Sequence, residues 1–185
     1  MLKHLGTKTL ETQSLILRKI QITDAQAMFD NWASDPVVTR YLSWPAHASV
    51  EITEMVINSW LAEYSSDAYY QWVIVSKDSG QPIGTIGLVQ ICADRKSAEV
   101  GYCLGQPWWQ QGIMSEALDV VMKYLLEKVG FCRIEARHDA RNPRSGAVMR
   151  KCGMVYEGTF REMMGSDHAL RDICHYAKTA ETVTR

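Results

Sequence analysis

The stretch "GYCLGQPWWQQGIMSEALDVVM", Gly101–Met122, places a strand end, a glycine loop and a helix start in direct succession. The strand pattern breaks at Gln106-Pro107, and two adjacent tryptophans and a single glycine follow before the apolar residues change to helical spacing. That spacing predicts an amphipathic helix from Ser115 to Lys128. The segment therefore predicts a loop around Gly112 that leads directly into a helix N-terminus.

Alternating apolar patterns upstream of this stretch predict a β-hairpin and a third antiparallel strand. The segments YYQWVIVS (69–76) and PIGTIGLVQI (82–91) flank KDSGQ, a five-residue turn that contains a glycine. The segment KSAEVGYCLG (96–105) follows with the same two-residue period. Three consecutive antiparallel strands are therefore expected before the glycine loop.

The segments downstream of the central helix predict a strand, a short helix and a final pair of strands. CRIEARHD (132–139) has a strand pattern, and Asn142-Pro143 has the residue types that open a helix. MVYEGTFREM (154–163) and ALRDICHYAKT (169–179) are predicted strands around a turn at Gly165-Ser166-Asp167. The short helix is expected to run to Lys151.

The N-terminal part of the chain predicts one strand and two helices. TQSLILRKI (12–20) is rich in β-branched and aliphatic residues and reads as a strand. A helix is expected from about Asp24 to Ser34, where Asp35-Pro36 stops it, and a second from about Ser49 to Tyr64.

The order of these elements predicts an α+β fold in a single domain that spans residues 1–185. About seven strands and four helices are expected, and the strand–loop–helix–strand segment in the middle implies one parallel pairing in a mostly antiparallel sheet. No internal repeat or low-complexity linker divides the chain. Such a mixed sheet can splay between its central parallel strands and admit a ligand there.

The composition narrows the function classes. Hydrophobic residues make up 46% and charged residues 22% of the chain, which is enough apolar material for a substantial core. The formal net charge of −1 argues against a nucleic-acid binder with a broad basic face. No apolar run approaches the ~20 residues of a membrane span, and Met1–Leu10 has no signal-peptide core. A cytoplasmic protein without a nucleic-acid or membrane partner is expected.

The five cysteines are widely spaced and form no CxxC pair, which argues against a zinc ribbon or a thioredoxin-like motif. Small core side chains in a reducing compartment are expected. A catalytic cysteine would need a partner histidine, and Cys103 with His138 stays open as that alternative. His138, His168 and His175 show no ligand spacing, so no metal site is assigned.

The loop before the central helix has the features of an anion-binding site. A helix start leaves its first N–H groups unpaired and carries a partial positive charge, and Gly112 lets the backbone approach a ligand because it has no Cβ. The Ser115 hydroxyl is available to cap the helix or to bind a phosphate oxygen. A plain turn glycine with an N-cap serine remains the alternative. Neither a P-loop nor a GxGxxG motif is present. Because the Glu116 carboxylate would repel an anion bound at this loop, we expect it to point away, for example to cap its own helix.

Three segments in this order resemble the GNAT acetyltransferases. They are AEVGYCLGQPWWQQGIMSEAL (98–118), NPRSGAVMRKCGMVYEG (142–158) and RDICHYA (171–177), and LETQSLILRKI (10–20) and SDPVVTRYL (34–42) extend the likeness to nearly the whole chain. The branch that it resembles is the ribosomal-protein N-terminal acetyltransferases and their relatives. The resemblance implies a GNAT fold, acetyl-CoA as co-substrate and an N-acetyltransferase activity.

The resemblance also implies which residues contact acetyl-CoA. The loop would wrap the pyrophosphate mostly through backbone N–H groups, although Trp109 and Met114 depart from the family pattern Gln/Arg-x-x-Gly-x-Gly/Ala and only Gly112 matches it strictly. The pantetheine arm would pair with the backbone of the preceding strand like an added strand. The cofactor contacts expected in this way are Tyr102, Leu104, Gln110, Gln111, Gly112, Ile113, Met114, Ser115, Asn142, Ser145 and Lys151.

Glu99 is the candidate general base. It shares one strand face with Gly101 and Cys103, and a glycine beside it is expected to leave space in front of its carboxylate. Burial would raise the pKa of this carboxyl toward that of a useful base, whereas a salt-bridged structural glutamate is the alternative. The resemblance implies the catalytic role, which one water molecule can relay.

Ser145 is the second catalytic candidate. Many GNAT enzymes carry a tyrosine on the helix after the asparagine that protonates the departing thiolate, and Met149 stands at that position here. In the branch that this chain resembles, a serine three residues after the asparagine lies near the thioester sulfur, which implies Ser145. Asn142 reads from the residues as an N-cap, and the resemblance implies a pantetheine contact. Arg141, Arg144, Arg150 and Lys151 are candidate partners of the CoA 3′-phosphate.

The acceptor side is expected to involve aromatic residues. Trp44, in a proline-flanked loop, and Trp72 are the candidate substrate contacts together with Glu99, and Tyr41 and Tyr102 are further candidates. Asp172 and Tyr176 match the closing strand of the family and are interpreted as structural, with a place of Tyr176 near the thioester as the alternative.

The acceptor is expected to be an amine, and the N-terminal α-amine of a protein is the preferred candidate, as in the ribosomal-protein branch. An acetyltransferase for a small amine, such as an antibiotic, an amino acid or a polyamine, is the first alternative and would show a closed, acidic acceptor pocket. A CoA-binding regulatory module without turnover is the second. Both a monomer and a homodimer are compatible with the sequence.

Overall fold

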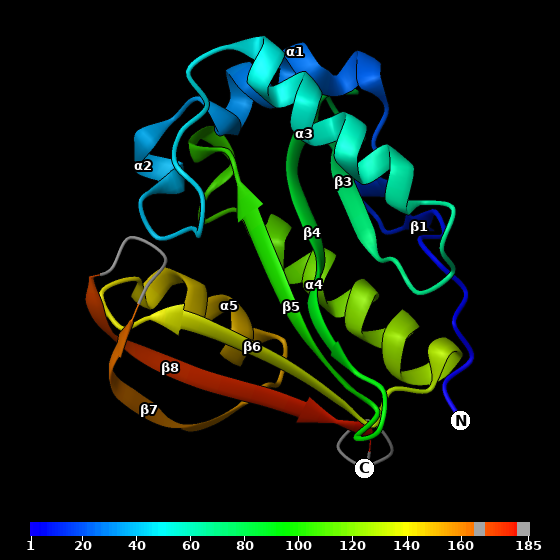
Figure 1. Ribbon diagram of the computed structural model, residues 1–185, viewed down its shortest axis with the longest axis vertical. Coiled ribbons are helices and arrows are strands. Elements are labelled where there is room, and N and C mark those ends of the chain that lie inside the picture. The colour runs from blue at the N-terminus through cyan, green and yellow to red at the C-terminus, as the bar shows by residue number, and fades with distance from the viewer. Residues whose placement is uncertain (165–168, 181–185) are drawn as a thin grey trace.

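The computed structural model describes residues 1–164 and 169–180, and its strands form one mixed sheet in the order β1-β2-β3-β4-β5-β6-β8-β7 (Figure 1). All neighbouring strands are antiparallel except β5 and β6, which are parallel. The strands are β1 Leu10–Glu11, β2 Leu15–Arg18, β3 Gln71–Ser76, β4 Pro82–Cys92, β5 Ser97–Leu104, β6 Arg133–Asp139, β7 Val155–Met164 and β8 Leu170–Thr179.

The sheet confirms the predicted mixed, mostly antiparallel arrangement of an α+β fold. In the described residues it has eight strands rather than about seven, because an additional short strand, β1, precedes the segment predicted as a strand over 12–20 and pairs with β2 inside that segment. The turn predicted at Gly165-Ser166-Asp167 lies outside the described residues.

The four predicted helices are present, and a fifth, α2, precedes α3. The helices are α1 Ala25–Met28, α2 Pro36–Thr39, α3 Val50–Glu63, α4 Ile113–Lys123 and α5 Pro143–Lys151. Helix α1 continues as a π-helical turn over Phe29–Ala33, and α4 continues in the same way over Tyr124–Val129. In the described part of the chain, no helix is long and apolar enough to cross a membrane.

Helix α2 begins at Asp35-Pro36, a pair of residues that we expected only to end the preceding helix. The side chain of Asp35 accepts a hydrogen bond from the N–H of Val37 at 2.8 Å, and Pro36 occupies the first turn. An aspartate N-cap followed by proline is a helix start as well as a stop for the preceding helix. This short helix matters because it brings residues 37–42 over the opening in the sheet.

Helix α4 begins two residues earlier than predicted. Gly112 is its N-cap, with a left-handed φ of 83°, and Ile113 is its first residue. Ser115 therefore lies buried inside the first turn. The alternative in which Ser115 is the N-cap residue is wrong.

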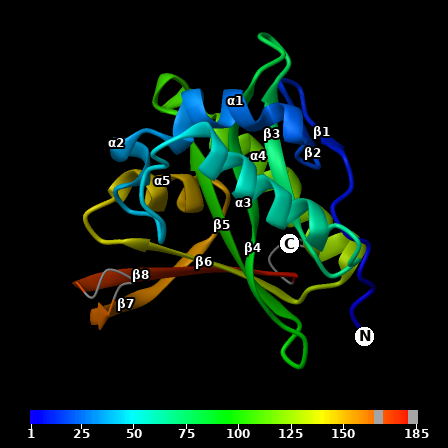
Figure 2. The same cartoon turned by 45° about the horizontal axis from the view of Figure 1, so that its top comes forward.

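The helices cover the two faces of the sheet separately. Helices α1 and α3 lie on one face, whereas α4 and α5 lie on the other (Figures 1 and 2). The cluster under α1 and α3 contains Trp32, Ile57 and Val73, each fully buried. The larger cluster around α4 includes Trp72 and Leu118. These two cores hold the central strands rigidly on both sides.

The central parallel strands diverge after a short paired segment. Residues Ser97–Glu99 of β5 pair with Arg133–Glu135 of β6, and no pairing between the two strands continues beyond this segment. Strand β5 runs on to Leu104 while β6 follows β8 instead, so that the two strands separate in Figure 1. The predicted splay is thus confirmed, and it opens toward the start of α4 and the start of α5.

Candidate active site

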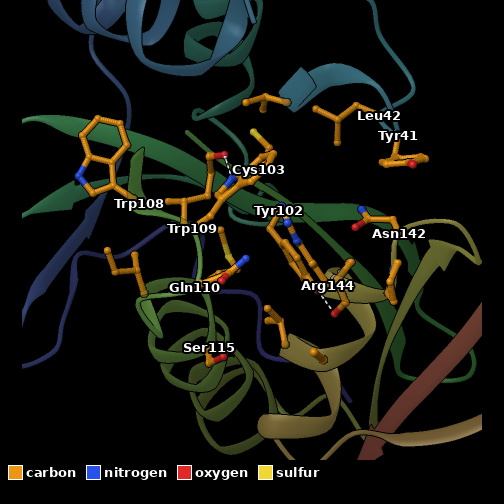
Figure 3. A pocket seen from close by; sticks show the side chains of 18 of the residues that line it. Tyr41, Leu42, Tyr102, Cys103, Trp108, Trp109, Gln110, Ser115, Asn142 and Arg144 are labelled. Atoms are coloured by element: carbon orange, nitrogen blue, oxygen red, sulfur yellow. Dashed lines mark hydrogen bonds between the residues drawn. The ribbon is translucent and has the colours of Figure 1, made fainter. Parts of the chain in front are cut away.

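A cavity of about 570 Å³ lies in the opening between β5 and the segment that follows β6 (Figure 3). Its floor is the end of β5, its walls are the loop before α4 and the first turns of α5, and α2 with the residues after it covers it. The cavity is lined by Val37, Val38, Arg40, Tyr41, Leu42, Tyr102, Cys103, Leu104, Trp108, Trp109, Gln110, Gly112, Ile113, Met114, Ser115, Arg141, Asn142, Pro143, Arg144, Ser145, Ala147, Val148 and Lys151.

The loop before α4 brings a helix N-terminus to this cavity. Gln110 and Gly112 both have a left-handed backbone, with φ values of 62° and 83°. The Lys151 ammonium group lies beside the loop, since Nζ of Lys151 is 3.4 Å from the position of a Cβ added at Gly112. Unpaired helix N–H groups and a nearby lysine together suit an anionic ligand.

The charged side chains around the cavity are cationic. Arg40, Arg141, Arg144 and Lys151 line it, whereas none of its lining residues in the described part of the chain is an aspartate or a glutamate. The guanidinium of Arg144 lies 5.5 Å from the ring centre of Trp109, and the guanidinium groups of Arg40 and Arg141 lie 5.3 and 6.0 Å from that of Tyr41. The cavity is therefore built for ligands that carry negative charge.

Glu116 points away from the cavity loop, as predicted, but its partner is not its own helix. Its carboxylate accepts hydrogen bonds from the N–H and the hydroxyl of Ser14, at 3.0 and 2.7 Å. Burial raises the pKa of Glu116, but the hydrogen bonds from Ser14 outweigh this and hold the pKa below its ordinary value. The carboxylate thus joins α4 to the segment before β2 and leaves the loop positive.

Tyr102 and Ser145 meet across the opening between β5 and α5. The Tyr102 hydroxyl donates to the Ser145 carbonyl oxygen at 3.1 Å and lies 3.0 Å from the Ser145 hydroxyl oxygen. Burial raises the pKa of Tyr102 well above its ordinary value, although the hydrogen bond from Ser145 opposes the shift. Figure 3 shows the Tyr102 side chain reaching from β5 toward the helix that carries Arg144.

Glu99 lies deeper, where β5 and β6 are still paired, and does not line the cavity. Its Oε1 is 2.7 Å from Nε of Arg137, and its side chain is 13% exposed. Burial raises the pKa of Glu99, while the charge and hydrogen bond of Arg137 lower it and Glu135 raises it, with a net upward shift. The carboxyl group is therefore both salt-bridged and shifted toward the pKa of a base, so both sequence interpretations describe part of its environment.

Gly101 accommodates a side chain of the neighbouring strand. A Cβ added at Gly101 would lie 2.9 Å from Cγ1 of Val89 in β4. Part of the space beside Gly101 is therefore filled, and open space in front of the Glu99 carboxylate stays a prediction.

The two tryptophans predicted at the acceptor side do not line the cavity. Trp72 has no exposed surface, and its indole N–H donates to the Lys8 carbonyl oxygen at 2.7 Å. Trp44 packs beside His47, with ring centres 5.2 Å apart, against the core under α1 and α3. The prediction for Trp72 is wrong because the residue belongs to the core, and Trp44 is not among the residues that line the cavity.

The predicted cofactor contacts gather around the cavity, apart from Gln111. The side chain of Gln111 donates to the Pro107 carbonyl oxygen at 2.7 Å and borders a neighbouring recess formed with Glu116 and Asp119. The other predicted contacts that line the cavity are Tyr102, Leu104, Gln110, Gly112, Ile113, Met114, Ser115, Asn142, Ser145 and Lys151.

Asn142 stands before α5 without capping it through its side chain. Its N–H donates to the Asp139 carbonyl oxygen at 2.7 Å, and its side chain borders the cavity instead. Asn142 is thus the N-cap residue of α5, as the sequence indicates, but its side chain makes no capping hydrogen bond. Met149 is buried in the core on the other side of the same helix.

Val37, Val38 and Leu42 form an apolar cover over the cavity that the sequence interpretation missed. The signal was present in the chain, since Asp35-Pro36 is a helix start. Reading it only as a stop left residues 36–42 as a loop. Apolar side chains above a cationic cavity are suited to the uncharged part of a ligand.

The alternative pair of Cys103 and His138 is not formed. The Cys103 sulfur lies 3.2 Å from the Thr85 hydroxyl oxygen among buried residues, and burial raises the pKa of the thiol. Nδ1 of His138 lies 2.8 Å from the Asp139 carbonyl oxygen, and its ring packs on Tyr176 under α5. The two side chains are on opposite faces of the sheet. In the described ranges, no group of three histidine, cysteine, aspartate or glutamate residues is arranged to hold a metal ion.

A family model described as an acetyltransferase (GNAT) domain matches residues 14–155. The chain is 34% identical over 155 residues to the uncharacterized N-acetyltransferase YoaA of Bacillus subtilis (strain 168), a match that covers 84% of this chain and 87% of that protein. It is 23% identical over 171 residues to the ribosomal protein uS5 alanine N-acetyltransferase of Escherichia coli (strain K12), covering 88% of this chain and 86% of that protein.

Solved structures share the fold. A GNAT-family acetyltransferase from Bacillus anthracis is similar with a TM-score of 0.84 at 22% identity, over 94% of this chain and 99% of that chain. The microcin C7 self immunity acetyltransferase MccE, in complex with acetyl-CoA and AMP, is similar with a TM-score of 0.81 at 19% identity, over 91% of this chain and 93% of that chain.

Proposed function

The chain belongs to the GNAT family of N-acetyltransferases, as its motifs predict, and we propose that it transfers the acetyl group of acetyl-CoA to the N-terminal α-amine of a protein. The observation that carries the choice of acceptor is the cationic cavity, which lacks lining carboxylates among the described residues. A cytoplasmic location belongs to the same proposal.

The residues around the cavity fit acetyl-CoA. The left-handed backbone at Gly112 and the Lys151 ammonium beside it form a cationic cradle. Loop N–H groups with Lys151 and Arg144 would hold the phosphates, because helix N-termini and cations bind such anions. The Tyr102–Leu104 backbone would hold the pantetheine amides, with Val37 and Leu42 covering the arm.

When bound, acetyl-CoA supplies the activated acetyl group and departs as a thiol. Glu99 would accept a proton from the attacking amine through a water molecule, since its carboxylate lies outside the cavity lining. The Ser145 hydroxyl would donate a hydrogen bond to the departing thiolate, which then takes a proton from water. A thiol with a pKa near ~8.5 leaves readily, so Ser145 contributes less than the cofactor loop does.

Proton removal favours an α-amine as acceptor. An α-amine with a pKa near ~8 costs about 1.4 kcal/mol to deprotonate at pH 7, whereas a lysine side chain near ~10.4 costs about 4.6 kcal/mol. A buried carboxyl that acts through a water molecule is a strong enough base to deprotonate an α-amine, whereas a lysine side chain is much harder for it to deprotonate. This argument supports a protein N-terminus over a lysine side chain.

The charge of the cavity disfavours a polyamine. A polycationic acceptor would meet Arg40, and the Asp139 carboxylate nearby is already bound to Arg141 at 2.6 Å, so no lining carboxylate among the described residues is available to bind the acceptor. A peptide N-terminus carries one amine and a neutral backbone, so it avoids this repulsion. The name of the uS5 alanine N-acetyltransferase, a relative at 23% identity, points the same way, while the name of YoaA specifies no acceptor.

A panel of acceptors tests the proposal. The protein is incubated with acetyl-CoA and, separately, with N-terminal peptides, amino acids, amino sugars and polyamines, and products are identified by mass. Acetylation of peptide α-amines supports the proposal. Acetylation only of small amines would show an acetyltransferase whose acceptor is a small amine and not a protein N-terminus. Acetyl-CoA binding without any product would support a regulatory module.

A further inference from the structure

We infer that the Tyr102 hydroxyl is a positioning group that orients the Ser145 hydroxyl toward the cavity. The inference rests on the proposed function, because it assigns Tyr102 a role in the same acetyl transfer. Tyr102 itself was expected to contribute backbone groups and a ring surface, not a hydroxyl.

The two side chains reach each other from separate elements. Tyr102 comes from β5 and Ser145 from the first turn of α5, on opposite sides of the opening, and both line the cavity. The phenolic oxygen is 3.1 Å from the Ser145 carbonyl oxygen and 3.0 Å from its hydroxyl oxygen. The tyrosine thus fixes both the backbone and the side chain of one residue.

The single proton of Tyr102 allows two arrangements of this pair. If Tyr102 donates to the Ser145 carbonyl, the serine hydroxyl donates back to the phenolic oxygen, and its proton points away from a ligand. If Tyr102 donates to the serine hydroxyl oxygen, the serine proton is free to reach an acceptor in the cavity. A ligand atom that accepts a hydrogen bond selects the second arrangement, which also makes the serine a stronger donor.

Tyr102 orients the serine rather than giving up its own proton. Burial raises the pKa of Tyr102 above its ordinary value, whereas a thiol titrates near ~8.5. A thiolate is therefore too weak a base to take the tyrosine proton. The Cys152 thiol, whose own pKa burial raises to about 11, raises the pKa of Tyr102 further. The charged groups that share the cavity are Arg40, Arg141, Arg144 and Lys151.

The first test is a double-mutant cycle in steady-state kinetics. Tyr102→Phe is expected to lower kcat about 5- to 10-fold with the KM for acetyl-CoA within about 2-fold, which corresponds to one lost hydrogen bond. In the Ser145→Ala background the same change is expected to cost less than about 2-fold. Tyr176→Phe is the matched control, because Arg150 of α5 donates to its hydroxyl at 2.8 Å outside the cavity lining. Equal losses from Tyr102→Phe in both backgrounds would overturn the inference.

The second test needs no turnover. In the wild type, the hydroxyl pair would stabilise the thiolate of CoA, so the affinity for CoA relative to acetyl-CoA, measured by calorimetry, should rise between about pH 7 and about pH 9. Ser145→Ala should abolish this rise, and Tyr102→Phe should reduce it at least about 2-fold. A merely structural defect would weaken both ligands equally at every pH.

The two tests separate the inference from the proposed function. If no amine is acetylated, the proposed function fails, and the CoA titration still decides the role of Tyr102. A pH dependence in Tyr102→Phe that equals that of the wild type would overturn the inference even in an active enzyme.

Discussion

The carboxylate of Glu99 lies 2.7 Å from Nε of Arg137, at the point where β5 and β6 are about to part. The Glu99 side chain is 13% exposed, whereas that of Arg137 is 51% exposed. The carboxyl group therefore bears most of the desolvation, which raises its pKa, while the arginine stays close to water. Burial and the Arg137 partner therefore act in opposite directions on the pKa of Glu99, and the net shift is upward.

Glu99→Gln should lower turnover and leave acetyl-CoA affinity within about 3-fold of the wild type. Loss of a general base typically costs about 10²- to 10⁴-fold in rate. Glu157→Gln is the control, because Glu157 has a 41% exposed side chain bound to Arg133 and does not line the cavity. Steady-state kinetics and calorimetry make the comparison, and an equal loss of affinity in Glu99→Gln would identify a structural residue.

The stability of Glu99→Gln should be unchanged or slightly higher at pH 7. Because burial raises the folded-state pKa of Glu99, its contribution to stability is present below its unfolded pKa and is lost as pH rises through the folded value. Removing the charge at neutral pH therefore removes the free-energy cost of burying the carboxylate, and the exposed Arg137 guanidinium is solvated by water. Urea unfolding at pH 7 checks this, and marked destabilisation would contradict it.

Arg137→Gln should shift the pH–rate profile to higher pH. The arginine lowers the pKa of Glu99, so its removal raises that pKa further and leaves less ionised base at a given pH. The rising limb of kcat/KM against pH should move upward, with recovery of the rate above the new pKa. A profile that keeps its position would show that Glu99 is not the titrating base.

Gly112→Ala should weaken acetyl-CoA binding about 10-fold or more. The new Cβ would lie 3.4 Å from Nζ of Lys151, and the φ of 83° is strained for alanine. Gly130→Ala is the control, because Gly130 ends the π-helical extension of α4 with a φ of 90° and open space around a Cβ. Both variants should lose about 1 kcal/mol of unfolding free energy, and only the first should lose affinity. Equal affinities would show that the loop is not the cradle.

Asp35→Ala should raise the KM for acetyl-CoA by loosening the cover of the cavity. Asp35 caps α2 through the N–H of Val37, and loss of such a cap costs about 0.5–2 kcal/mol. The control is Asp30→Ala, which removes an exposed carboxylate that is bound to Gln26 in the preceding turn. Kinetics at varied acetyl-CoA concentration compare the two. An unchanged KM in both would mean that α2 does not contribute to binding.

The strand pattern and the splay were predictable because their signals are local. Residues 69–91 alternate around a short turn, and one parallel pair in an antiparallel sheet follows from a loop and a helix between two strands. Gly112 likewise stands at a backbone position that needs a left-handed φ, so its place at the helix start follows from its residue type.

The parts that failed depend on tertiary packing. Trp72 has the same strand spacing as its apolar neighbours, and only the packing around Tyr124 and Tyr70 places it wholly inside. The partner of Glu99 lies on another strand, and the register of β5 with β6 decides that Arg137 reaches it. Helix α2 is different, because its signal at Asp35-Pro36 was local and was interpreted only as a stop.

The measurement that tests the account most directly uses two peptides of one sequence with acetyl-CoA. One has a free N-terminus and no lysine, and the other has a blocked N-terminus and one lysine. Mass spectrometry at pH 7 should find acetylation on the first and little or none on the second, because the α-amine is the easier to deprotonate. Acetylation of the blocked peptide alone, or of small amines while both peptides stay unmodified, would contradict the assignment of a protein N-terminus as acceptor.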